Sequence, residues 1–199
     1  METRIFKGIV IGLGHKIRTG KDTAAKALVR ELGFTQASFA NALKQEIIDT
    51  IPRTLLAYAE EHFSGEEYDS RDRADQINDL IYTNRTPVTR ALLQEWGTEL
   101  RRSEDEDYWV KKLEKQIIAG DYGNRVVITD MRFPNEAAMV RRLRGKTVRI
   151  DRPGMPQLNH PSETSLDDYQ GWDACIINAG TQEAFEDTVI EMVQEWLNG

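Results

Sequence analysis

The sequence has a single cysteine, Cys175, among its 199 residues. One thiol excludes an intramolecular disulfide and a zinc site built from several cysteines, and it is typical of a cytoplasmic protein. The neighbours of Cys175, in DACIIN, predict a buried strand thiol rather than a catalytic one.

Long apolar runs and an excess of positive charge are also missing. The first residues, METRIFKGIVIGLG, contain too short an apolar stretch for a membrane span and no small-residue cleavage site, so we expect no membrane partner. The net charge of -7 argues against a protein that coats nucleic acid. It leaves a mononucleotide substrate open, because such a ligand needs only a few well-placed cations. Without an obvious linker or repeat, residues 1–199 are expected to form one domain.

Apolar strand-like segments alternate with amphipathic helix-like segments along the chain. This alternation predicts an α/β fold in which helices cover both faces of a parallel sheet and ligands bind at the carboxyl ends of the strands. Residues 52–85 fit neither pattern and are interpreted as a surface insertion. Strands are expected at 5–11, 34–38, 125–129, 147–150 and 174–177, and helices at 21–32, 39–51, from 86, at 135–144 and from 181.

A glycine-rich segment, GLGHKIRTGKDTAAKAL, follows the first expected strand. It places Gly14 and Gly20-Lys21-Asp22-Thr23 between a strand and a helix, as a phosphate-binding loop requires. Inward-pointing backbone N–H groups and the helix N-terminus would bind phosphate oxygens, and Lys21 could bridge the β- and γ-phosphates of ATP. The alternative is a glycine-rich turn with an exposed lysine.

This loop departs from the usual G-x-x-x-x-G-K-[ST] pattern at two points. Five residues separate Gly14 from Gly20, so the loop is one residue longer, and Asp22 replaces the Ser or Thr that normally ligates Mg²⁺. A carboxylate can hold Mg²⁺ directly or through water, and Thr23 could supply a hydroxyl one position later. A magnesium cofactor is therefore still expected.

A second signal lies in RVVITDMRFPNEAA, at the end of a β-branched strand. Asp130 ends this strand, where an acid would face the phosphates and magnesium. Arg132 follows closely enough to bind a transferring or acceptor phosphate through two hydrogen bonds. Taken singly, Asp130 could cap a helix and Arg132 could be a surface charge.

The helix expected from residue 86 carries Arg90 and Gln94 one turn apart. These side chains offer a guanidinium for a phosphate and an amide for a base, or else form a solvated face. Phe39 or Trp96 could stack on a base or belong to the core. Arg152, in a proline-containing loop, could close over the phosphates or be a plain surface residue.

Six segments together resemble, in order, the deoxynucleoside monophosphate kinase family best known from bacteriophages. The resemblance covers about residues 8–195 and is carried by GKDTAA, SFANALK, RALLQEWGTELRR, ITDMRFPNEA, HPSET and DACIINAGT. It implies a P-loop kinase three-layer sandwich with a helical acceptor-binding region at 38–110 and a lid segment at 152–170. It also implies transfer of the γ-phosphoryl group of ATP, with Mg²⁺, to a deoxynucleoside monophosphate.

The resemblance, together with the motifs, assigns roles to individual residues. The catalytic residues would be Lys21, Asp130 and Arg132, and the metal ligands Asp22 and Asp130. The ATP site would comprise Gly14, Lys16, Arg18, Thr19, Gly20, Lys21, Asp22, Thr23, Arg152, Asn178 and Gly180. The acceptor site would comprise Ser38, Phe39, Lys44, Arg90, Gln94, Trp96 and Arg132.

Other readings remain open from the sequence alone. Another small-molecule P-loop kinase, such as a dephospho-coenzyme A or phosphomevalonate kinase, has a similar GKD loop. A non-catalytic nucleotide-binding module is a further alternative, whereas the acidic balance disfavours a kinase acting on a nucleic acid polymer. Related enzymes suggest a homodimer, located in the host cytoplasm if the chain is phage-encoded.

Overall fold

The computed structural model describes residues 6–50, 81–82, 93, 96, 101–155 and 158–199. The chain divides into two compact units, which are described separately below. The first unit comprises Met1–Phe39 and Val110–Gly199, and the second comprises Ala40–Trp109.

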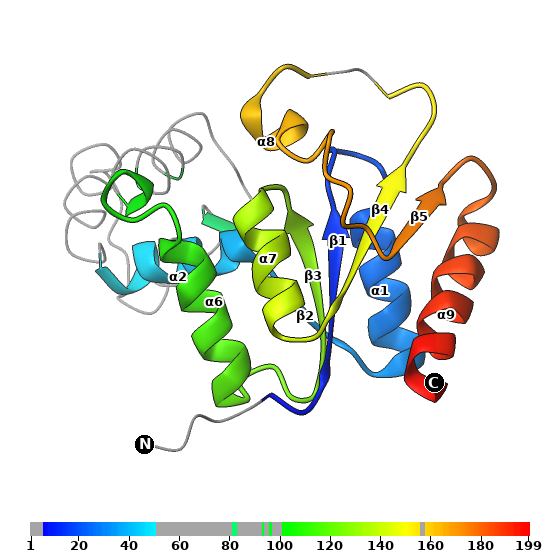
Figure 1. Ribbon diagram of the computed structural model, residues 1–199, viewed down its shortest axis with the longest axis horizontal. Helices are drawn as coiled ribbons and strands as arrows, with labels where there is room; N and C mark the ends of the chain where they lie inside the picture. Colours follow the sequence, from blue (N-terminus) through cyan, green and yellow to red (C-terminus); the bar gives the residue numbers. More distant parts are fainter. Residues whose placement is uncertain (1–5, 51–80, 83–92, 94–95, 97–100, 156–157) are drawn as a thin grey trace, which may run out of the picture. The chain divides into compact units, whose positions relative to one another are not determined.

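The first unit is built on a five-stranded parallel sheet with strand order β2-β3-β1-β4-β5 (Figure 1). Because all strands run in one direction, their carboxyl ends lie along a single edge, and β1 lies at the centre of the sheet. Each strand expected from the sequence is present, with limits shifted by a few residues. The strands are β1 Ile9–Gly14, β2 Thr35–Ala37, β3 Arg125–Met131, β4 Lys146–Asp151 and β5 Ala174–Ile177.

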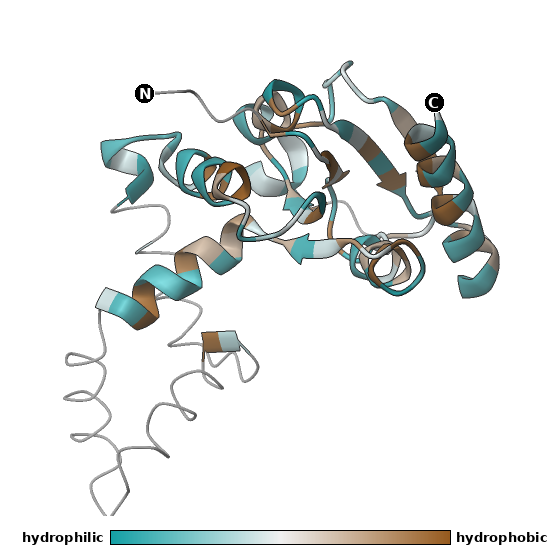
Figure 2. Ribbon diagram, turned by 90° about the horizontal axis from the view of Figure 1, so that it is seen from below, coloured by the Kyte–Doolittle hydropathy of each residue, from teal (hydrophilic) through white to brown (hydrophobic). Residues whose placement is uncertain are grey.

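Helices cover both faces of this sheet, which confirms the predicted three-layer α/β fold. On one face, α1 (Lys21–Leu32) and α9 (Gln182–Asn198) pack against strand residues such as Ile11 and Val127. On the other face lie α7 (Pro134–Arg142) and the part of α6 (Tyr108–Ala119) that belongs to this unit. Figure 2 shows the polar residues of α9 on its outward side, as expected for a helix with one buried face.

The ends of two helices follow the sequence signals that predict them. Gly33 caps the C-terminus of α1 in the left-handed region, with φ 65°, and its N–H donates to the carbonyl of Leu28. At the start of α9, the side chain of Thr181 accepts a hydrogen bond from the N–H of Ala184 at 3.2 Å.

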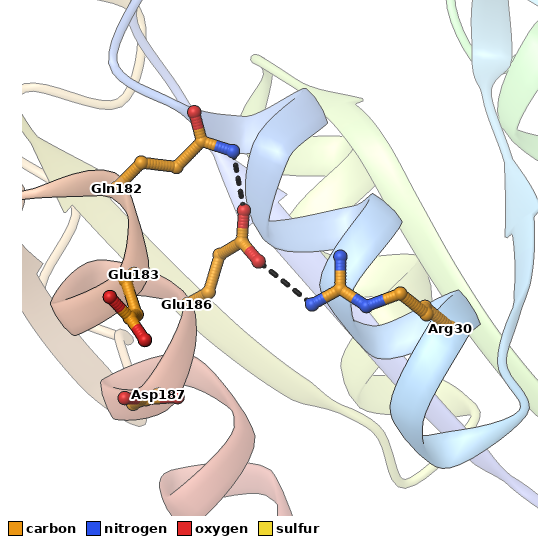
Figure 3. Close-up of a pocket in the computed structure, with 5 residues that line it drawn as sticks. All are labelled: Arg30, Gln182, Glu183, Glu186 and Asp187. Atoms are coloured by element: carbon orange, nitrogen blue, oxygen red, sulfur yellow. Dashed lines mark hydrogen bonds and ion pairs between the residues drawn. The ribbon is translucent and has the colours of Figure 1, made fainter.

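An ion pair links α1 and α9 at the surface, beside a shallow pocket (Figure 3). The guanidinium of Arg30 donates to Glu186 at 2.8 Å, and the amide of Gln182 donates to the other oxygen of Glu186 at 2.7 Å. Glu183 and Asp187 complete the lining of this pocket. Its negative charge makes it unsuitable for a phosphate, and its contacts are those of helix packing.

One helix of this unit was not expected from the sequence, and one prediction is wrong. Helix α6 was not predicted, although its core residues Val110, Leu113 and Ile117 have helical spacing. The prediction of a buried Cys175 is wrong, because this thiol is exposed. Strand β5 lies at the edge of the sheet, and of its residues only Ile176 joins the core under α1 and α9. Successive side chains of a strand point to opposite faces, so Cys175 and Ile177 point to the other, less covered face.

The second unit contains α2 (Phe39–Thr50), as predicted, whose Glu46 is 6% exposed. The carboxylate of Glu46 accepts hydrogen bonds from Trp96 at 3.2 Å, Arg101 at 2.8 Å and Tyr108 at 2.7 Å. The helix predicted from residue 86 lies outside the described residues. Among the residues that are described, no helix is both long and apolar enough to cross a membrane.

Candidate active site

The phosphate loop, residues 14–23, runs from the end of central strand β1 into α1, at the carboxyl edge of the sheet. The position of Gly14 requires a glycine, because a Cβ there would lie 2.4 Å from the ring of Trp172. Sequence and fold therefore place the loop where parallel α/β sheets bind ligands.

Gly20 is the N-cap of α1 and supplies no side chain to cap the first N–H groups of that helix. Its φ of 112° is left-handed, and a Cβ at this position would lie 2.6 Å from the amide nitrogen of Asn178. A helix N-terminus without a capping side chain directs N–H groups and partial positive charge outward. This arrangement suits an anionic ligand such as a phosphate.

Lys21 is only 7% exposed, and its ammonium group donates a hydrogen bond to the backbone carbonyl of Lys16. Burial, together with the nearby charge of Arg132, lowers the pKa of Lys21 from 10.5 to about 8. Three nearby carboxylates raise the pKa of Lys21 and so oppose this effect: those of Glu163, Asp22 and Asp130. A phosphate bound beside Lys21 would likewise favour its charged form.

One residue of the lengthened loop, His15, is turned into the protein interior. His15 is fully buried, and its Nε2 lies 2.8 Å from the carboxylate of Asp167, which also pairs with Lys16 at 2.8 Å. The imidazole stacks against Trp172, with ring centroids 6.0 Å apart. Burial lowers the pKa of His15. His15 thus anchors the loop to the 165–172 segment.

Both oxygens of Asp130 are held by the end of β2. The hydroxyl of Ser38 donates to Oδ2 at 2.8 Å, and the N–H of Phe39 donates to Oδ1 at 3.0 Å. The side chain of Phe39 is 3% exposed and packs in the core. The negative charge of Asp130 raises the pKa of Lys21, so Asp130 lies near the phosphate loop.

Arg132 is fixed at both its backbone and its side chain. Its N–H donates to Glu136 at 2.6 Å, which orients the entry into α7. Its guanidinium pairs with Glu163 and donates to the carbonyl of Ser162 at 3.2 Å, both in the short helix α8 (Pro161–Thr164). Glu163 in turn accepts a hydrogen bond from the N–H of Ile17 in the phosphate loop at 2.7 Å.

From the sequence, Glu163 was assigned only to the lid segment at 152–170 and to HPSET, with no individual role. The one available signal was its presence in this short motif, between segments with assigned roles. Its function as a partner of Arg132 and Ile17 depends on contacts 31 and 146 residues away along the chain. Spacing within a sequence cannot reveal such distant contacts.

The remaining predicted ATP-site residues differ in how closely they approach the loop. Asn178 donates from its side chain to the carbonyl of Thr19 at 2.9 Å. Arg18 has a φ of 59° and is exposed, and Arg152 and Gly180 are exposed as well. The structure thus links Asn178 directly to the loop, while the proximity of Arg152 to ATP stays a prediction.

The two predicted magnesium ligands, Asp22 and Asp130, lie near enough to Lys21 that their negative charges raise its pKa. Asp22 is exposed in the first turn of α1. Within the described part of the chain, no group of three or more His, Cys, Asp or Glu side chains could hold a metal. Magnesium in kinases needs only one or two carboxylates together with substrate phosphates and water, so this donor set fits Mg²⁺.

The acceptor residues are less well defined by the structure. Arg90 and Gln94 lie outside the described residues. In the second unit, Lys44 is 7% exposed with its ammonium 4.7 Å from the ring centre of Tyr82, and Trp96 is bonded to Glu46 as described above. Their roles in binding an acceptor stay predictions.

Comparison with known proteins identifies the family. The family model for deoxynucleotide monophosphate kinase matches residues 70–189. A putative deoxynucleotide monophosphate kinase of Acanthamoeba polyphaga mimivirus is 31% identical over 198 residues, covering 93% of this chain and 96% of the relative. The chain belongs to the deoxynucleotide monophosphate kinase family. It is therefore a kinase, an enzyme that transfers phosphoryl groups.

Two further similarities accompany this kinase assignment. The uncharacterized protein ORF77 of Ictalurid herpesvirus 1 (strain Auburn) is 39% identical over 109 residues, which is 52% of this kinase and 47% of that protein. The solved dephospho-CoA kinase from Campylobacter jejuni has 17% sequence identity and a TM-score of 0.46, covering 94% of this kinase and 96% of that chain.

Proposed function

We propose that this kinase transfers the γ-phosphoryl group of Mg·ATP to a deoxynucleoside monophosphate, giving ADP and the deoxynucleoside diphosphate. The observation that carries the proposal is that Lys21 lies buried within reach of the charges of Asp130 and Arg132, at an uncapped helix N-terminus. Family membership supports the same reaction.

The proposed chemistry is an in-line displacement at the γ-phosphorus. An oxygen of the acceptor monophosphate forms a bond to the γ-phosphorus, while the bond between this phosphorus and the oxygen bridging to the β-phosphorus breaks. ADP leaves with the electron pair of that bond. No general base is needed, because the acceptor monophosphate is already an anion at neutral pH.

In this reaction the protein contributes position and positive charge. The first N–H groups of α1 and the ammonium of Lys21 bind the β- and γ-phosphates, and Arg132 binds the group in transfer. The loop residues Lys16, Arg18 and Thr19 border the ATP phosphates. Asn178, bonded to Thr19 at 2.9 Å, keeps the loop against the end of β5.

Asp130 and Asp22 are the residues proposed to hold Mg²⁺, with the phosphates and water completing its coordination. When bound, magnesium neutralises charge on the β- and γ-phosphate oxygens. The hydrogen bonds from Ser38 and Phe39 keep the carboxylate of Asp130 in one orientation.

The acceptor is proposed to bind through residues of the 38–110 region, with Arg90 on its phosphate and Gln94 on its base. The segment 152–170 is proposed to close over the phosphates and keep water from intercepting the phosphoryl group. A homodimer stays a prediction.

A coupled ADP-release assay tests the proposal. Purified protein with Mg·ATP is offered each deoxy- and ribonucleoside monophosphate, and in parallel dephospho-coenzyme A and phosphomevalonate. Release of ADP only with deoxynucleoside monophosphates supports the proposed acceptor class, whereas turnover of dephospho-coenzyme A alone would identify a different small-molecule kinase. ATP binding without ADP release for any acceptor would indicate a non-catalytic module.

Two lysine variants on α1 supply the site-specific arm of this assay. Lys21→Ala should abolish transfer, and Lys26→Ala, which removes an exposed charge from the same helix, should leave it unchanged. Circular dichroism checks that both variants fold. Normal turnover by Lys21→Ala would remove the assignment of the loop to ATP.

A further inference from the structure

The carboxylate of Glu163 joins three separate parts of the first unit. One oxygen accepts the N–H of Ile17 in the phosphate loop at 2.7 Å, and the other pairs with the guanidinium of Arg132 after β3. Glu163 itself lies in α8, which follows β4. The same carboxylate also favours the charged form of Lys21.

Glu163 is only 5% exposed, and burying a carboxylate is costly unless it is paired and hydrogen-bonded. Each of its oxygens has a partner, and the guanidinium donates a second hydrogen bond to the carbonyl of Ser162 at 3.2 Å. This pairing leaves Arg132 with little freedom. Removal of the negative charge of Glu163 would leave Arg132 without this ion-pair partner and would take away one of the carboxylates that favour the charged form of Lys21.

The contact between Glu163 and the phosphate loop lies apart from the expected phosphate site. Its bond goes to Ile17, in the first half of the loop, whereas the uncapped N–H groups begin at Lys21 in α1. The carboxylate thus secures the loop on one side and leaves the helix N-terminus open. A residue that merely imitated a phosphate would be expected to occupy that N-terminus.

We propose that Glu163 is a positioning residue, which holds the guanidinium of Arg132 against the phosphate loop in the orientation required for phosphoryl transfer. This inference rests on the proposed function. Glu163 acts through Arg132 and does not contact the reacting atoms. Because the carboxylate comes from α8, the 152–170 segment takes part in building the site.

The test compares four proteins in the ADP-release assay: the unsubstituted chain, Glu163→Gln, Arg132→Gln and the double variant. The Gln variant at 163 retains the size of the side chain and an oxygen for the N–H of Ile17, but it loses the charge. Asp168→Asn is the matched control, because it removes an exposed carboxylate from the same segment. ATP affinity and thermal unfolding are measured for every variant.

We expect Glu163→Gln to lower kcat by about tenfold or more while changing the Kd for ATP by less than about threefold, because it disturbs an interaction of the transition state. The loss should disappear when Arg132 is already replaced, so that the double variant is no slower than Arg132→Gln. Asp168→Asn should behave as the unsubstituted chain. If the Gln variant folds poorly, Glu163→Asp, which retains the charge at shorter reach, should lose kcat with ATP affinity unchanged.

Three results would overturn the inference. Multiplicative losses in the double variant would mean that Glu163 acts independently of Arg132. Tighter ATP binding by Glu163→Gln, with kcat maintained, would mean that the carboxylate competes with phosphate. An unaffected kcat in a folded Gln variant would mean that it has a structural role only. In each case the unsubstituted chain turns over, whereas its failure to use any acceptor would instead contradict the proposed function and the inference with it.

Discussion

The hydroxyl of Ser38 donates a hydrogen bond to the carboxylate of Asp130 at 2.8 Å, which joins the ends of β2 and β3. The second oxygen of Asp130 receives the N–H of Phe39 at 3.0 Å. Two donors from one short segment thus fix the plane of a single carboxylate. This arrangement separates the charge of Asp130 from its orientation, so the two can be tested by different substitutions.

We expect Asp130→Asn to raise the Mg²⁺ concentration needed for half-maximal rate by roughly tenfold or more, because an amide is a weaker ligand for a hard cation than a carboxylate. Ser38→Ala retains the charge and removes one hydrogen bond, so it should cost about 1 kcal/mol of stability and change the Mg²⁺ requirement much less. Magnesium titrations of the rate, with urea unfolding, measure both effects. An unchanged Mg²⁺ requirement in Asp130→Asn would remove this residue from the metal site.

Lys21 should make stability depend on pH in the alkaline range. Its pKa in the folded state is about 8, below the ordinary value of 10.5. Between these values the folded protein releases the proton first, so the unfolded chain binds more protons and the free energy of unfolding rises with pH. Below pH 8 the lysine is protonated in both states and contributes no slope.

Urea unfolding at several pH values between 7 and 10.5 measures this contribution. Lys21→Met should have a smaller increase in unfolding free energy across the window than the unsubstituted protein. Lys26→Met, at an exposed position of the same helix, should retain the full increase. Identical pH profiles for all three proteins would argue against a lowered pKa at Lys21.

Gly20 and Gly33 both have left-handed backbones, but their surroundings differ. A Cβ at Gly20 meets the amide of Asn178 at 2.6 Å, whereas a Cβ at Gly33 meets nothing within 4 Å. Gly33→Ala should therefore cost about 1 kcal/mol from the backbone alone. Gly20→Ala should cost more and should also weaken ATP binding, which calorimetric titration with ATP and chemical unfolding would detect. Equal losses of stability with ATP affinity retained would contradict the close approach of Asn178.

Glu46 should be a major stabilising residue of the second unit, because three donors share its buried carboxylate. Glu46→Gln places an NH₂ group opposite one or more of these donors, and we expect a loss of about 1–3 kcal/mol in urea unfolding. Glu104, whose side chain is 61% exposed and which lies 3.5 Å from Arg101, is the matched control. Glu104→Gln should change stability by less than about 0.5 kcal/mol.

The sequence predicted the sheet well because its signals are local. Each strand is a short apolar run, and the ends of α1 and α9 follow from single residues, Gly33 and Thr181. Helix α6 was missed although Val110, Leu113 and Ile117 have helical spacing, so there the signal was present and overlooked. The exposure of Cys175 depended on the place of β5 at the sheet edge, which its own residues do not encode.

The site was predictable to the extent that it consists of contiguous motifs. Lys21, Asp130 and Arg132 were selected from two such motifs, and the structure brings them close enough for their charges to interact. Glu163 could not be selected in this way, because its partners are distant in the chain. The same applies to His15, whose burial depends on Trp172 and Asp167.

The bonds that complete the phosphate loop have a consequence for biosynthesis. Three hydrogen bonds hold the loop to residues that are synthesised much later. They join Ile17 to Glu163, His15 to Asp167 and Thr19 to Asn178, across 146, 152 and 159 residues of the chain. A ribosome must therefore translate between 146 and 159 further residues before the loop acquires these contacts. The nascent polypeptide should gain affinity for nucleotide only after Asn178 has emerged.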